Sequence, residues 1–165
     1  MLKSISSRSL RASPGTFAIV ASQYNARYVD AMLRAARAEL KRAGAREVKV
    51  YRVPGAYEIP VVVSRLANHP ATPGNTRTGL ASPLAIICLG VILRGETVHA
   101  AHIGEAVSRA LMEIQVRQRI PIIHEVLLLE NEEQARARCL SKTHNRGTEA
   151  AQTALQMARL LSRMA

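Results

Sequence analysis

The amino-acid sequence predicts an α/β domain in which helices cover both faces of a parallel sheet. Short apolar runs of strand length alternate along the chain with longer stretches in which apolar residues recur at helical spacing. One run, Leu84–Leu93, is apolar throughout, which is typical of a strand buried on both faces of a parallel sheet. This alternation favours a three-layer α/β/α sandwich with a four-stranded parallel sheet and right-handed crossovers. The length of 165 residues suits one such domain, which we expect at residues 16–165.

Two strands and two helices are predicted in the first half of the chain: strands at residues 17–22 and 47–53, helices at residues 27–43 and 59–66. In the first helix the apolar positions recur at helical spacing, and Gly44 ends the pattern. The second strand alternates valines with charged neighbours, and Pro54-Gly55 provides a turn after it. Pro60 suits the first turn of the second helix, where a missing N–H costs no helical hydrogen bond.

Two strands and three helices are predicted in the second half: strands at residues 84–93 and 121–129, helices at residues 99–118, 131–139 and 148–164. Asn131 caps the short helix, which carries acids in its first turn and arginines in its last, as the helix dipole favours. We interpret Asn145-Arg146-Gly147 as a break before the last helix. Residues 68–83 are rich in Pro, Gly, Thr and Asn and are predicted to form an exposed loop.

Residues 1–15 are interpreted as a flexible basic tail that precedes the domain. They contain Lys3, Arg8 and Arg11, several serines and no acid, a composition that an organellar targeting segment would share. The segment is short and its amphipathic periodicity is poor, so we favour the tail over the targeting segment.

The formal charge of +11 first raises the hypothesis of nucleic-acid binding. The basic residues are spread over several helices instead of forming one stripe, and one Phe and no Trp offer few rings for base stacking. We therefore expect solvated helix faces and no nucleic-acid partner, with an acidic cargo as the alternative. No apolar run is long enough to suggest a membrane partner. Cys88 and Cys139 show no metal or redox spacing, so we expect no metal and a reducing cytoplasm.

Three predicted strand–helix junctions carry side chains that are suited to chemistry, and in a parallel sheet they meet at one edge. The junctions are Tyr24-Asn25, residues 55–58 and residues 94–99. Histidine is the side chain type best suited to proton transfer at physiological pH, which makes His99 a candidate for that role. Tyr24 could stack on a flat ring or pack over the end of the sheet. Glu58 could accept hydrogen bonds from hydroxyls or interact with the helix dipole, and the residues do not separate these alternatives.

Two residues of the second half are further candidates. His124 lies in an apolar strand, where a histidine is more often a hydrogen-bonded core residue than a ligand. Arg138 ends a short helix and could clamp a phosphate with two hydrogen bonds, although it could equally compensate the helix dipole. Arg136 competes with it for that role. The first strand–helix junction lacks both the G-x-G-x-x-G and the Walker patterns, so neither a dinucleotide nor an ATP site is expected.

Four segments occur in the order and spacing of the lumazine synthase family: VPGAYEIP (53–60), LGVILRGETVHAAHI (89–103), NEEQARAR (131–138) and NRGTEAA (145–151). Residues 17–163 resemble this family. The resemblance implies a flavodoxin-like fold and the condensation of 5-amino-6-(D-ribitylamino)uracil with 3,4-dihydroxy-2-butanone 4-phosphate. The products would be 6,7-dimethyl-8-ribityllumazine, phosphate and water, in the penultimate step of riboflavin biosynthesis. It also implies no cofactor, pentamers that sometimes build decamers or sixty-subunit shells, and sites shared between two subunits.

The resemblance assigns a role to individual residues. His99 takes the position of the proton-transfer histidine. The ribitylaminouracil is expected to contact Tyr24, Ala56, Tyr57, Glu58, Val91, Ile92, Leu93 and His124. The butanone phosphate is expected to contact Glu96, Thr97 and Arg138, and the neighbouring subunit supplies Arg138.

Several positions depart from the family pattern. The family usually has an aromatic residue in place of His124, and an aromatic-Asp-aromatic run in place of Ala100-Ala101-His102. Arg146 stands where a lysine is frequent. These departures leave two alternatives open: a catalytically inactive, shell-forming protein of the same fold, and a flavin-binding module. The retained Arg94, Thr97, His99 and Arg138 favour the enzyme.

Overall fold

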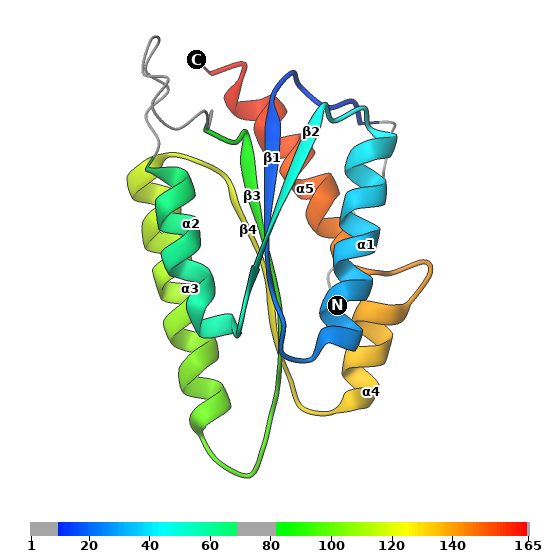
Figure 1. The fold of residues 1–165 in the computed structure, drawn as a ribbon, viewed down its shortest axis with the longest axis vertical. Helices are drawn as coiled ribbons and strands as arrows, with labels where there is room; N and C mark the ends of the chain where they lie inside the picture. Colours follow the sequence, from blue (N-terminus) through cyan, green and yellow to red (C-terminus); the bar gives the residue numbers. More distant parts are fainter. Residues whose placement is uncertain (1–9, 69–81, 165) are drawn as a thin grey trace.

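The chain folds around a four-stranded, wholly parallel sheet with the strand order β2-β1-β3-β4. A computed structural model describes residues 10–68 and 82–164. The strands are β1 (Thr16–Ser22), β2 (Glu47–Val53), β3 (Ala85–Leu93) and β4 (Ile122–Leu129). Helices cover both faces of the sheet (Figure 1), so the predicted three-layer α/β/α sandwich is confirmed, and it is flavodoxin-like.

The helices divide into two layers (Figure 1). One layer contains α1 (Ala26–Arg42) and α5 (Arg146–Leu161), together with α4 (Glu132–Ala135) and the π-helical turn η2 (Arg136–Leu140). The other layer contains α2 (Ile59–Ala67), which follows the 3-10 turn η1 (Ala56–Glu58), and α3 (His99–Gln118). Because the strands are parallel, each crossover leads back to the amino edge of the sheet. Every strand therefore ends at the same carboxyl edge.

Strand β3 supplies side chains to a hydrophobic core on each face of the sheet. Ile87 and Leu89 pack with α1 and α5, whereas Ile86 and Cys88 pack with α2 and α3. All four side chains are fully buried. Each buried aliphatic side chain of this size contributes about 1.5–3 kcal/mol to folding. Burial on both faces explains why this strand is apolar throughout.

The last helix begins earlier than the sequence suggested, so the interpretation of Asn145-Arg146-Gly147 as a break is wrong. The Asn145 side chain accepts a hydrogen bond from the Gly147 N–H at 2.8 Å and so caps α5, which starts at Arg146. A Cβ atom on Gly147 would lie 2.0 Å from the Met32 carbonyl oxygen. Glycine is needed here because α1 and α5 approach each other closely, and not because the helix is interrupted.

The short helix predicted at residues 131–139 is only partly regular. Asn131 caps it as predicted, since its side chain accepts a hydrogen bond from the Gln134 N–H at 3.0 Å. The α-helical part ends at Ala135, and the chain continues as the π-helical turn η2. Cys139 in this turn is fully buried, and its carbonyl accepts a hydrogen bond from the Asn145 side chain.

The predicted tail and the predicted loop at residues 68–83 lie largely outside the described residues. Within the described part of the tail, the Ala12 N–H donates to the Ala43 carbonyl at 2.8 Å, and Leu10 packs against the core on the α1 side. Residues 10–15 therefore contact the domain. Among the helices of the described residues, none has the length and apolarity needed to cross a membrane.

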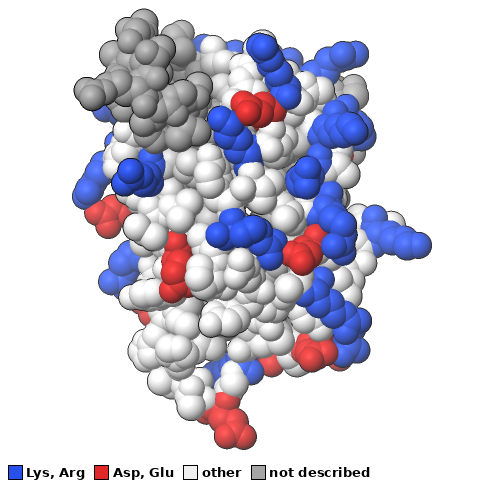
Figure 2. Space-filling model, in the orientation of Figure 1, with Lys and Arg blue, Asp and Glu red and all other residues white. Residues whose placement is uncertain are grey.

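Lysine and arginine side chains are dispersed over the face of the molecule in Figure 2, and several lie next to acidic ones. Many of these cations are neutralised within the chain. Arg52 contacts Asp30 at 2.6 Å, for example, and Arg136 contacts Glu132 at 2.8 Å. On this face the charge follows the dispersed pattern expected from the sequence.

Candidate active site

A pocket of about 1150 Å³ lies at the carboxyl edge of the sheet, where the three predicted junctions meet. Eight residues named from the sequence line it: Tyr24, Ala56, Tyr57, Glu58, Val91, Ile92, Leu93 and His99. The junctions after β1, β2 and β3 form one end of the pocket, and one side of α3 forms its wall. The predicted convergence of these junctions is confirmed, while the substrate contacts of each residue stay predictions.

The turn before α2 holds Tyr24 and Glu58 close together. The Gly55 N–H donates to the carboxylate Oε2 of Glu58 at 2.8 Å, which caps the start of η1. A Cβ atom on Gly55 would lie 2.9 Å from that oxygen and 3.0 Å from Cδ2 of the Tyr24 ring. Any larger residue would push the two side chains apart. The second oxygen of Glu58 makes no hydrogen bond to the described residues, and Glu58 lines the pocket.

The side chain of Asn25, just after β1, is hydrogen-bonded to the end of β3. This role of Asn25 was not predicted from the sequence. Its backbone is left-handed, with φ of 55°, a conformation that asparagine adopts more readily than most residues. Its side-chain amide donates to the Val91 carbonyl at 2.8 Å. This bond fixes the pocket end of β3 relative to the loop that carries Tyr24.

Two tyrosine rings give the mouth of the pocket an exposed aromatic surface. Tyr24 is 71% exposed and Tyr57 is 63% exposed, although both lie beside the apolar end of β3. Exposed rings next to apolar chain suit a flat, partly polar ligand, because the rings offer apolar area and their hydroxyls stay hydrated.

One side of α3 extends the pocket beyond His99, and this wall was missed in the sequence. His102, Ala106, Arg109 and Glu113 follow His99 along it, with spacings of three or four residues. Arg109 is paired with Glu105 at 2.8 Å, and both are well exposed. The helical spacing from His99 is the signal that would have identified these positions.

Four predicted residues do not line this pocket. Glu96 and Thr97 are exposed in the loop before α3, and the Thr97 hydroxyl accepts a hydrogen bond from the His99 N–H at 3.4 Å. His124 lies in the middle of β4, where its Nε2 is 2.9 Å from the Ser108 hydroxyl and burial lowers its pKa. Arg138 is exposed in η2, in the α1 and α5 layer, across the sheet from α3.

The described residues contain no group of three or more His, Cys, Asp or Glu side chains placed to hold a metal ion. The groups that the pocket lining presents include the tyrosine rings, the Glu58 carboxylate, the His99 and His102 imidazoles and backbone groups.

The fold and the pocket define an α/β protein whose candidate site lies at the carboxyl edge of a parallel sheet, where such folds bind small ligands. The sequence model of the 6,7-dimethyl-8-ribityllumazine synthase family matches residues 15–162, and the chain belongs to that family. The resemblance seen in the four sequence segments is therefore confirmed, and the chain is an enzyme of the transferase class.

Three curated proteins named 6,7-dimethyl-8-ribityllumazine synthase illustrate the similarity. One from Xanthomonas campestris pv. campestris (strain B100) is 36% identical over 154 residues, covering 92% of this chain and 93% of the relative. One from Xanthomonas oryzae pv. oryzae (strain PXO99A) is 37% identical over 154 residues with the same coverage, 92% and 93%. One from Stenotrophomonas maltophilia (strain R551-3) is 37% identical over 150 residues, covering 90% of each chain.

Proposed function

We propose that the pocket at the carboxyl edge is where this chain condenses 5-amino-6-(D-ribitylamino)uracil with 3,4-dihydroxy-2-butanone 4-phosphate. The products are 6,7-dimethyl-8-ribityllumazine, phosphate and water, in the penultimate step of riboflavin biosynthesis. The observation that carries the proposal is the meeting of Tyr24, Glu58 and His99 in one pocket of a chain that belongs to this family.

The pyrimidine ring lies against the Tyr24 ring in this proposal, with its edge along the backbone of residues 91–93. The unengaged Glu58 oxygen accepts hydrogen bonds from the ribityl hydroxyls, while the other oxygen keeps the turn closed through Gly55. Ala56 and Tyr57 in the same turn flank the ribityl chain. Supporting this arrangement, the turn is fixed by its own hydrogen bond, so the site is formed before the substrate binds.

The reaction needs two reactants held together and protons moved between them. The substrate amine attacks the ketone carbon to form an imine and release one water, and phosphate then leaves. The ribityl-bearing nitrogen attacks the remaining carbonyl carbon, and the second ring closes with loss of a second water. Holding both reactants converts a bimolecular step into an effectively unimolecular one. His99 relays the protons. Arg138 stabilises the charge of the departing phosphate, with Glu96 and Thr97 beside it.

A ring of subunits is needed to complete this site. Arg138 and the pocket lie on different sides of the sheet of one chain, so a single chain cannot direct Arg138 into its own pocket. A cyclic assembly repeats one heterologous interface and joins the pocket of each subunit to Arg138 of the next. We propose a pentamer as this assembly, with a decamer or sixty-subunit shell as larger forms and an acidic cargo as a possible content of a shell.

We also place this enzyme in the cytoplasm, with small molecules as its ligands and no nucleic-acid partner. In support, Cys88 and Cys139 are both buried free thiols, as expected in a reducing compartment.

Turnover by the purified protein tests the proposal directly. The protein is incubated with both substrates, and formation of the fluorescent lumazine and release of phosphate are followed together. The two should appear at equal rates, and Tyr24→Ala should raise the KM of the pyrimidine. Retention of bound flavin without lumazine formation would instead indicate the flavin-binding module. Assembly into shells without turnover would indicate the inactive shell protein.

A further inference from the structure

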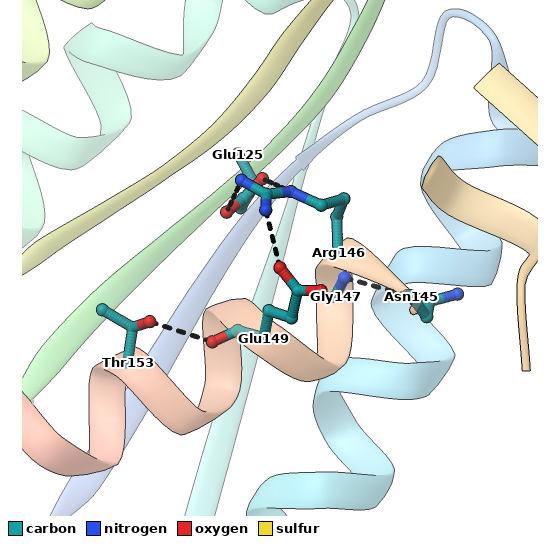
Figure 3. A network of polar contacts seen from close by, with 6 residues as sticks. All are labelled: Glu125, Asn145, Arg146, Gly147, Glu149 and Thr153. Atoms are coloured by element: carbon teal, nitrogen blue, oxygen red, sulfur yellow. Dashed lines mark hydrogen bonds and ion pairs between the residues drawn. The ribbon is translucent and has the colours of Figure 1, made fainter. Parts of the chain in front are cut away.

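Glu125 and Arg146 form a partly buried ion pair between β4 and the start of α5 (Figure 3). Arg146 donates from Nε and Nη2 to the two carboxylate oxygens of Glu125, both at 3.0 Å. Its third nitrogen donates to Glu149 one turn further along α5 at 2.6 Å. Glu125 is only 6% exposed. The guanidinium is therefore held by two carboxylates that belong to different layers of the fold.

The two partners of this ion pair adjoin segments that carry two of the predicted substrate-binding residues, His124 and Arg138. Successive side chains of a strand point to opposite faces, so Glu125 faces α5 while the adjacent His124 faces α3 and contacts Ser108. On the other side, Asn145 precedes Arg146 and donates to the carbonyl of Cys139 in η2. Arg138 immediately precedes that cysteine.

The charges around Glu125 come from α5 and η2. They are Arg146 and Glu149 on α5 and Arg138 on η2, with the Cys139 thiol nearby, while the β3 residue paired with Glu125 is the apolar Leu89. Burial raises the pKa of Glu125 to about 7, although the charges of Arg146 and Arg138 oppose this shift. Burial also raises the pKa of the Cys139 thiol to about 11, which leaves the thiol neutral at neutral pH.

We propose that Glu125 is a positioning residue of the phosphate site, which holds Arg146 and the η2–α5 connection and so fixes the position from which Arg138 reaches the neighbouring subunit. The inference rests on the proposed function, because only a shared site gives Arg138 a ligand. When Glu125 is protonated, Arg146 keeps one carboxylate partner, and the connection that carries Arg138 loses its link to β4. The affinity for the phosphate substrate should then fall.

The test compares steady-state kinetics of the parent with those of Glu125→Gln from pH 6 to pH 9. Glutamine keeps the shape of the side chain but cannot carry the charge. Above pH 8 the KM of the butanone phosphate should rise about tenfold, the effect expected for a lost hydrogen bond to a charged group. The KM of the pyrimidine and kcat should change less than twofold. The ratio of variant to parent KM should fall towards one as the pH approaches 6, where most of the Glu125 of the parent is itself protonated.

Glu149→Gln is the matched control, because it removes the other partner of Arg146 and leaves the Glu125 contacts in place. Its effect on KM should be smaller and independent of pH. Arg146→Lys provides a second test if Glu125→Gln does not assemble, since it keeps a cation but loses the paired hydrogen bonds. It should raise the KM of the butanone phosphate selectively. Assembly of each variant is checked by native mass spectrometry.

Two kinds of failure are distinguishable. A parent protein without turnover would overturn the proposed function itself. An active parent in which Glu125→Gln leaves both KM values unchanged, raises both equally, or shifts KM by the same factor at every pH would overturn the positioning role. A lower KM for the butanone phosphate would overturn it as well, because Glu125 would then act by reducing the positive charge near Arg138.

Discussion

The pocket at the carboxyl edge differs in construction from the junction at which β4, η2 and α5 meet, which contains Glu125, Asn145 and Arg146. Pocket side chains such as Tyr24 and Tyr57 are exposed, and backbone turns hold them in place. At the junction, Glu125 and Asn145 are buried, and each has side-chain or backbone partners within the chain. The first region is an open pocket with exposed rings. The second region joins β4 to the segment that carries Arg138, a residue that does not line the pocket of its own chain.

Under the proposed function, this difference corresponds to a division of labour between subunits. Each chain would form the pyrimidine half of a site in its own pocket and provide part of the phosphate half to a neighbour. The second role requires support for Arg138 from within its own chain, because a functional side chain must be held in its productive geometry by the residues around it. The predictions below test this division, beginning with the largest expected effect.

Mixing two defective variants tests whether the site is shared. His99→Ala should lower the catalytic rate roughly 10- to 1,000-fold, the range that general acid–base catalysis supports. Arg138→Ala should also be poor. When both variants are expressed in one cell, the subunits mix. A site is intact only if the chain that supplies His99 carries Arg138→Ala and the chain that supplies Arg138 carries His99→Ala. About a quarter of the sites in random rings meet that condition, so activity should recover towards a quarter of the parent value.

His144→Ala and Arg136→Ala are the matched controls for this experiment. His144 is exposed and lies outside the pocket lining, and Arg136 is paired with Glu132 at 2.8 Å. Both should be close to the parent in turnover. If hybrid rings, identified by mass spectrometry, show only the average activity of the two defective variants, then the site lies within one subunit and the role of Arg138 is wrong.

Gly147→Ala should lower the free energy of unfolding more than any conservative substitution in the pocket. The added methyl group would meet the Met32 backbone, which cannot move without shifting α1. We expect a loss of about 3 kcal/mol or more in the free energy of unfolding, as for a severe case of overpacking. Gly95→Ala is the control, because its added Cβ has no neighbour within 4 Å, and it should stay within about 0.5 kcal/mol. Chemical denaturation at fixed protein concentration measures both, and equal stability of the two variants would contradict the close approach of α1 and α5.

The positions of the strands and helices were predictable because periodicity reports burial directly. Strand β2 and helix α3 begin and end where the pattern indicated. The start of α5 was not predictable in the same way. Asparagine followed two residues later by glycine is found in turns as well as in caps, and only the contact between Gly147 and Met32 shows why the glycine lies inside the helix.

The site was only partly predictable for a different reason. Tyr24, Glu58 and His99 were found because strand ends of a parallel sheet meet at one edge. Which side of α3 faces the pocket depends on how the helix packs, so His102 was missed. Glu125 was missed because its partner, Arg146, is 21 residues away in the sequence. A single charged residue in an apolar strand does not identify such a partner.

The pH dependence of stability should also distinguish the two regions. The pKa of Glu125 is about 7 in the folded chain against an ordinary value of 4.5, so between these values the folded state binds more protons than the unfolded state. The free energy of unfolding should therefore fall as pH rises from 4.5 to 7 and then level off, by about 3 kcal/mol at most. Glu125→Gln should remove this fall, and Glu149→Gln should keep it. Urea unfolding from pH 5 to pH 8 measures the difference between variant and parent. A difference that does not change with pH would contradict the raised pKa.

The smallest expected effect concerns His102, which lies one turn after His99 on the pocket wall formed by α3. Its imidazole is exposed, so it can contact a ligand that extends from His99 along the helix. Because Glu96 and Thr97 lie at the same end of α3, we expect this ligand to be the butanone phosphate. His102→Gln should raise its KM about two- to fivefold, the effect of one neutral hydrogen bond, and leave the KM of the pyrimidine unchanged. His144→Gln, outside the pocket, should change neither value. A loss of kcat as large as that of His99→Ala would show that His102 shares the proton transfer, and the pocket wall would then belong to the catalytic machinery and not only to substrate binding.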